Sequence, residues 1–167
     1  KIKGHIYILE ALKKIKSEGV KLPAFIFVGD GPERKNLEIF AEENDLTNIK
    51  FVGEVLEIGK YLKQMDVFVF PSLSEGLGIA ILEALVAKKL IIASNIGGIK
   101  ELIKNKETGI LVEPTNVDDL YNAIKWVLEN KEEAIKLREE SFKWINQNKN
   151  LFGIREVSKK YSEYLCS

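Results

Sequence analysis

The sequence is poor in the residues that build disulfides and metal sites. Its 167 residues include one cysteine, Cys166, and one histidine, His5. A single thiol cannot form an internal disulfide, and the sequence has no Cys/His cluster with the spacing of zinc ligands. These absences predict a protein of the reducing cytoplasm that carries no structural metal.

Long apolar runs and a net charge are also missing. No run approaches the roughly 18 apolar residues of a membrane span, and no signal peptide is visible. The 25 Lys and Arg residues balance 25 Asp and Glu residues, so no overall field attracts nucleic acid or a membrane. We expect a cytoplasmic location and no nucleic-acid partner, and leave open peripheral association with the inner face of the membrane.

Two common phosphate-binding motifs are also absent. There is no Walker-type glycine loop and no Asp-x-Asp pair for a metal-bound diphosphate, since Asp118 and Asp119 are adjacent and indicate a helix start. No metal ligand is therefore predicted.

What the sequence does contain is an alternation of short apolar runs with longer amphipathic ones. Strands are expected at residues 24–28, 49–52, 67–70, 90–93 and 109–112. Helices are expected around 6–15, from Pro32 to about Asn44, and at 57–65, 77–87, 99–103, 118–129, 132–146 and 152–165. Apolar strands buried on both faces and strand–helix alternation predict an α/β fold: a Rossmann-like, doubly wound parallel sheet with helices on both faces. Residues 1–167 are read as one domain.

Ligands of such sheets bind at the carboxyl ends of strands, so the segments after the strands are the candidate sites. Gly29 opens a Gly-Asp-Gly-Pro turn, for which a plain turn is the favoured interpretation. Residues 71–78 join a strand to a helix, and the amides of Gly76, Leu77 and Gly78 are expected to be free for an anion. Alternatively, Ser74 only caps the helix.

Two further candidates are charged. Glu83 is the one carboxylate within the apolar helix 77–87, which predicts a buried charge that needs either a structural partner or a ligand diol. Lys3, followed by glycine before a helix, could reach a phosphate or simply face solvent. His5 is more often a packing residue than a base in such a setting.

Together these residues resemble the C-terminal, nucleotide-sugar-binding domain of a family 4 (group 1) glycosyltransferase of GT-B fold. The matching segments, in order, are Lys3-Gly4, 27–32, 51–55, 66–72, Glu75-Gly76-Leu77-Gly78, Glu83-Ala84, 92–94, Gly97-Gly98, Glu101 and 109–112. The resemblance covers nearly the whole chain.

The resemblance implies a role for each residue. Lys3 would bind the donor diphosphate, and the backbone of Gly76, Leu77 and Gly78 would hold phosphate and sugar. Glu75 would lie beside the transferred sugar as the catalytic residue, and Glu83 would accept the ribose hydroxyls. Gly29, Gly53 and Val55 complete the donor-binding set, the last two beside the base. The resemblance also implies a retaining enzyme that uses a nucleoside-diphosphate sugar and no metal or other cofactor.

The sequence departs from the family pattern at its start. The arginine and the first strand that normally precede the lysine are not in the chain, which begins with Lys1 rather than Met. A fragment of a larger two-domain protein is therefore expected, with the acceptor bound by an N-terminal domain and no transfer by the fragment alone. Residues 88–90 also stand where the family commonly has a Gly-x-Pro turn.

Three alternative functions remain. They are a sugar-nucleotide epimerase, which the paired glutamates disfavour, a non-catalytic module of the same fold, and a glycogen- or starch-synthase-type glucosyltransferase.

Overall fold

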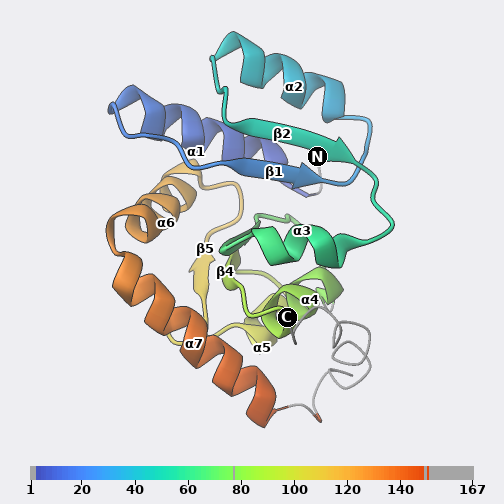
Figure 1. The fold of residues 1–167 in the computed structure, drawn as a ribbon, viewed down its shortest axis with the longest axis vertical. Helices are drawn as coiled ribbons and strands as arrows, with labels where there is room; N and C mark the ends of the chain where they lie inside the picture. Colours follow the sequence, from blue (N-terminus) through green and yellow to red (C-terminus); the bar gives the residue numbers. More distant parts are fainter. Residues whose placement is uncertain (1–2, 77, 149, 151–167) are drawn as a thin grey trace.

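The computed structural model describes residues 3–76, 78–148 and 150 (Figure 1). Helices and strands alternate as the sequence predicts. The strands are β1 (Phe25–Val28), β2 (Ile49–Gly53), β3 (Val67–Phe70), β4 (Leu90–Ser94) and β5 (Ile110–Val112). The helices are α1 (His5–Ser17), α2 (Arg34–Glu43), α3 (Ile58–Gln64), α4 (Ile79–Val86), α5 (Ile99–Leu102), α6 (Val117–Glu129) and α7 (Lys131–Gln147). The helix expected at 152–165 and the thiol of Cys166 lie outside the described residues.

The five strands pair in parallel but in two groups. One sheet has the order β1-β2, and the other has the order β3-β4-β5. Phe25 is in register with Ile49, and Val67 is in register with Leu90. The parallel α/β architecture is confirmed, but the ladder is interrupted between β1 and β3.

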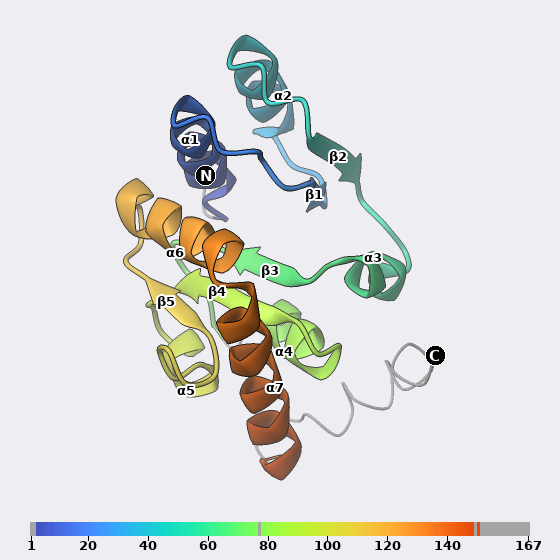
Figure 2. The ribbon, with the colours of Figure 1, turned by 60° about the vertical axis from the view of Figure 1, so that its left-hand side comes forward.

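Helices cover both faces of the three-stranded sheet, with α6 on one side and α4 and α5 on the other (Figure 2). The alternation of side chains along β4 explains this arrangement. Ile92 packs into the core built around α1 and α6, whereas Ile91 and Ala93 pack into the core built around α4 and α5. All five residues of β4 are buried, as a central parallel strand requires.

The prediction that every strand is buried on both faces is wrong for β1, β2 and β3. All four residues of β3 are only half-buried, and in β1 only Phe27 is buried. The physical reason is positional, because each of these strands has one edge that no other described strand covers. An apolar run therefore identifies a strand but does not show whether both of its edges are paired.

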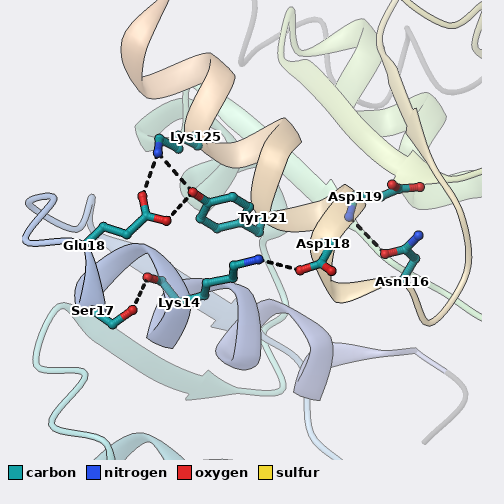
Figure 3. Close-up of polar contacts among 8 residues, drawn as sticks. All are labelled: Lys14, Ser17, Glu18, Asn116, Asp118, Asp119, Tyr121 and Lys125. Atoms are coloured by element: carbon teal, nitrogen blue, oxygen red, sulfur yellow. Dashed lines mark hydrogen bonds and ion pairs between the residues drawn. The ribbon is translucent and has the colours of Figure 1, made fainter.

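Helices α1 and α6 lie side by side although about a hundred residues separate them in the sequence, and a polar cluster joins them (Figure 3). Glu18, just after α1, accepts hydrogen bonds from Tyr121 Oη and from Lys125 Nζ, the latter at 2.6 Å. Lys14 Nζ pairs with Asp118 Oδ1 at 2.6 Å and lies over the Tyr121 ring, 4.4 Å from its centroid. This cluster links α1 to α6, and Lys3, a residue of the candidate site, lies two residues before α1 begins.

Among the described residues, no helix has the length and apolar character that crossing a membrane requires.

Candidate functional site

The segment from β3 to α4 places the two glycines of the motif at a helix start. Gly78 is the N-cap of α4, has a φ of 66°, and its carbonyl accepts hydrogen bonds from the amides of Ile81 and Leu82. Gly76 is exposed, with open space where a Cβ would stand, so a ligand can approach its backbone. The suggestion that Ser74 caps the helix is wrong, because α4 has Gly78 as its N-cap and no side-chain cap. Leu77 lies outside the described residues.

Glu75 and Lys3 meet at this point although 72 residues separate them. Lys3 Nζ donates a hydrogen bond to Glu75 Oε2 at 2.6 Å. The Glu75 side chain is 20% exposed and that of Lys3 is 52% exposed, so the pair borders solvent. Lys3 Nζ also lies 5.2 Å from the centroid of the Phe70 ring at the end of β3.

Backbone contact between Gly4 and Pro71 holds Lys3 in this place. A Cβ built on Gly4 would stand 2.0 Å from the Pro71 carbonyl oxygen, and the φ of Gly4 is 68°. Only glycine satisfies both conditions. The start of α1 is therefore pressed against the carboxyl end of β3.

Glu83 lies within α4, and its environment differs from the one that the sequence predicts. It is half-buried and lines a cleft between β1 and β3. The expectation of a charge enclosed within a buried helix is wrong. Its neighbour in sequence Leu82 is 1% exposed and Ile79 is 60% exposed, so α4 has one open side.

Gly29 and Gly53 form a second group, at the carboxyl ends of β1 and β2. The Gly29 amide donates to the Gly53 carbonyl at 2.7 Å, and their φ angles are 115° and 73°. Val55, two residues further, is half-buried. Because both glycines adopt left-handed conformations, this group offers backbone rather than side-chain contacts to a ligand.

Arg34, which the sequence did not single out, supports this second group. Its guanidinium Nη1 lies 2.8 Å from where a Gly53 Cβ would stand and 3.2 Å from Asp30 Oδ2, and its Nη2 donates to the Phe51 carbonyl at 3.3 Å. The Gly31 amide, and then Arg34, lower the pKa of Asp30. Arg34 was missed, and the contacts of Phe70 with Lys3 and of Pro71 with Gly4 were not foreseen, because these roles arise from contacts between distant segments. Only the sequence Gly-Pro-Glu-Arg at residues 31–34 hinted at Arg34.

His5 connects the two groups as a packing residue. Its ring makes an edge contact with Phe27, at 5.5 Å between centroids, and burial lowers its pKa. The structure thus agrees with the interpretation of His5 as a packing residue. Val28 and Phe70, which precede the two groups, both line the same cleft.

The arrangement has two chemically distinct parts. Lys3 and the Gly76 backbone can hold an anion, and Glu75 and Glu83 can accept hydrogen bonds from hydroxyl groups.

Parallel strands with helices on both faces place this chain among the doubly wound α/β proteins, whose ligands bind at the carboxyl ends of the strands. The sequence model of the Glycosyl transferases group 1 family matches residues 1–144, and the chain belongs to that family.

Individual relatives agree with this assignment. The chain is 30% identical over 166 residues to an uncharacterised glycosyltransferase of Methanocaldococcus jannaschii, covering 96% of the chain and 46% of the relative. It is 37% identical over 134 residues to the UDP-Gal:alpha-D-GlcNAc-diphosphoundecaprenol alpha-1,3-galactosyltransferase of Escherichia coli, covering 77% of the chain and 34% of the relative. The crystal structure of a glycosyltransferase from Rickettsia africae superposes with a TM-score of 0.80 at 28% identity, over 100% of the chain and 46% of that protein. The chain thus spans less than half the length of these relatives.

Proposed function

We propose that the chain is the donor-binding domain of a retaining glycosyltransferase that transfers a hexose from a nucleoside-diphosphate sugar to a glycan, lipid or small-molecule acceptor. The observation that carries this proposal is the Lys3–Glu75 pair at 2.6 Å, next to the exposed Gly76 in the loop between β3 and α4. Family membership and the UDP-Gal in the name of the Escherichia coli relative support a donor of this class.

The pair suggests how the donor is bound. The diphosphate takes the place of Glu75 as the partner of Lys3, since phosphate oxygens and a carboxylate compete for the same ammonium group. Glu75 is then free to accept hydrogen bonds from the hydroxyls of the transferred sugar. Glu83 accepts the ribose hydroxyls, the amides of Gly76, Leu77 and Gly78 bind phosphate, and the backbone at Gly29, Gly53 and Val55 lies beside the base.

The proposed reaction proceeds on one face of the sugar. The bond from the anomeric carbon to the diphosphate oxygen breaks, and its electron pair leaves with the nucleoside diphosphate. The acceptor oxygen bonds to the anomeric carbon from the same side, and its proton passes to the leaving phosphate oxygen. Lys3 stabilises the negative charge that develops on this group, so the proposal includes no metal ion.

Calorimetric titration of the full-length protein with UDP, GDP and ADP tests the proposal, followed by a transfer assay in which NMR determines the anomeric configuration of the product. We expect one nucleotide to bind with a clear preference and the product to retain the donor configuration. A Glu83→Gln variant should bind the nucleotide about tenfold more weakly, since one charge-assisted interaction is lost. Absence of binding by the full-length protein would instead indicate a non-catalytic module, and preference for ADP- or UDP-glucose with an α-glucan acceptor would indicate a glucan synthase.

A further inference from the structure

The side chain of Arg34, the first residue of α2, joins the carboxyl-end segments of β1 and β2. Its Nη1 donates to Asp30 Oδ2 at 3.2 Å, its Nη2 to the Phe51 carbonyl at 3.3 Å, and its Nε to Glu38 Oε1 at 2.8 Å. Asp30 follows β1, Phe51 belongs to β2, and Glu38 belongs to α2. One guanidinium therefore links three segments of the chain.

The contact with β2 lies at an irregularity of the strand pair. Consecutive residues of β1 are in register with Phe51 and with Gly53, so Val52 is the extra residue of a bulge. A bulge bends its strand and redirects the residues that follow, and bulges often border functional sites. The hydrogen bond from Arg34 to the Phe51 carbonyl thus holds β2 at the point where its end changes direction.

Beyond the bulge, the ends of β1 and β2 approach each other through two glycines that differ in their surroundings. A Cβ built on Gly29 would meet nothing within 4 Å, so the backbone there is open to a ligand. A Cβ built on Gly53 would stand 2.8 Å from Arg34 Nη1 and 3.7 Å from Asp30 Oδ2. The guanidinium therefore fills the space that a side chain at position 53 would need.

A binding surface made of glycine backbone needs support from elsewhere. Glycine loses more conformational freedom on becoming ordered than any other residue, and a ligand that has to order it binds more weakly by that cost. Arg34 contacts both sides of the glycine pair, at Asp30 next to Gly29 and at Phe51 two residues before Gly53. These contacts order the pair before a ligand arrives.

We propose that Arg34 is a positioning residue for the nucleoside, whose guanidinium holds the backbone at Gly29 and Gly53 in the conformation that binds the base. The inference rests on the proposed function, in which this backbone lies beside the base and Lys3 binds the diphosphate. Arg34 itself does not bind the diphosphate. Two carboxylates, those of Asp30 and Glu38, already neutralise its charge.

The role requires an arginine and not just a positive charge. A lysine ammonium is a point charge on a flexible stem, and it cannot reproduce the three contacts that the planar guanidinium makes. Arg34→Lys therefore keeps the charge and loses the links, whereas Arg34→Met loses both. Lys35→Met is the matched control, because Lys35 is the next residue of α2, is exposed and carries the same charge.

Calorimetric titration of the full-length protein with UDP, GDP, ADP and inorganic pyrophosphate tests the proposal. Both Arg34 variants should bind the preferred nucleotide about tenfold more weakly and discriminate less among the three bases, with pyrophosphate binding within about twofold of the wild type. Lys35→Met should leave all four affinities within about twofold. In a transfer assay, both Arg34 variants should raise the KM for the donor about tenfold and leave kcat within about twofold, because the sugar and diphosphate contacts are elsewhere.

Thermal midpoints of the same variants separate positioning from a general contribution to stability. A lowered midpoint with unchanged nucleotide affinity and base preference would show that Arg34 only stabilises the fold, and would overturn the proposal. Equal losses of pyrophosphate and nucleotide binding would place Arg34 in the phosphate site, and would also overturn it. A wild type that binds none of the three nucleotides refutes the proposed function and this inference together, whereas Arg34 variants that bind nucleotide as the wild type does refute this inference alone.

Discussion

Lys3 Nζ lies 2.6 Å from Glu75 Oε2, so the residue before α1 and the residue before the Gly76–Gly78 turn share one ion pair in the free protein. A bound diphosphate would compete with Glu75 for Lys3. The two residues should therefore have opposite effects on the binding of a small anion, although both lie in the same site.

The first prediction concerns this competition. Lys3→Ala in the full-length protein should weaken binding of inorganic pyrophosphate and of the preferred nucleotide about 10- to 100-fold, because a charge-assisted hydrogen bond is lost. Glu75→Gln should strengthen pyrophosphate binding several-fold, because Lys3 loses its competing partner, and should reduce sugar transfer on the order of a hundredfold. Isothermal titration and transfer rates measure these effects. Lys14→Ala is the control, since Lys14 makes an equally short pair with Asp118 away from the site; equal effects of Lys3→Ala and Lys14→Ala would refute the assignment.

A second prediction concerns Gly4. Gly4→Ala should destabilise the protein by roughly 2–5 kcal/mol, because the left-handed φ and the contact with the Pro71 carbonyl each add strain. Gly19→Ala isolates the first effect, since Gly19 has a φ of 74° and nothing within 4 Å of its Cβ position. It should cost about 1–2 kcal/mol. Urea unfolding of both variants measures the difference, and equal costs would show that the Pro71 contact is unimportant.

A third prediction follows from the half-buried ring of His5, whose pKa is lowered by burial and, to a smaller extent, by the nearby charge of Lys3. The folded protein binds the proton less tightly than the unfolded chain does. Stability should therefore decrease as the pH falls from about 6.5 toward the pKa of His5 in the folded protein. No other histidine contributes in this range. His5→Phe, which can keep the edge contact with Phe27, should make the urea midpoint nearly independent of pH between 7.5 and 5.5; an unchanged slope would assign the effect to another group.

A fourth prediction concerns the polar cluster of Figure 3, in which hydrogen bonds from Lys125 and then from Tyr121 lower the pKa of Glu18. The ionised Glu18 thus stabilises the fold above its ordinary pKa, and the contribution is lost as the pH falls through the lowered value. Glu18→Gln should be less stable than the wild type at pH 7, and the two proteins should converge below about pH 4. Thermal midpoints measured from pH 3 to 7 test this. Glu43→Gln, an exposed substitution at the end of α2, should show no such convergence.

A fifth prediction concerns metal ions. If Lys3 and backbone amides neutralise the diphosphate, treatment of the full-length protein with EDTA should leave the transfer rate within about twofold of the untreated rate. A loss of activity that added Mg²⁺ or Mn²⁺ restores would show that a cation shares this task.

Local sequence patterns predicted the helices and strands well, because the spacing of apolar residues within each segment depends on which of its own faces is buried. The strand at residues 67–70 was predicted with the bounds that β3 has, and α6 differs by a single residue at its start. In both, the apolar spacing matches the period of the structure. Only the family resemblance, which indicated that the first strand is not in the chain, predicted an interrupted sheet, since a strand with one open edge has the same apolar sequence as an enclosed one.

The site was predicted less completely, for a physical reason. Lys3 and Glu75 could be chosen as candidates, but their direct contact depends on how Gly4 packs against Pro71. Arg34 was missed because its importance comes from the space beside Gly53, which no spacing in the sequence describes. Glu83 was expected to be enclosed because the helix pattern ignores what lies beside the helix.

The packing of α1 against α6 has a consequence for synthesis of the chain on the ribosome. The partners of Glu18 and Lys14 lie at residues 118–125, so α1 cannot reach its final neighbours until α6 has been translated. At about 5–20 residues per second, roughly 5–20 seconds pass between these two points. During that interval the apolar side of α1 is available to chaperones, and translation speed across the intervening segment becomes a factor in how much of the protein reaches its native state.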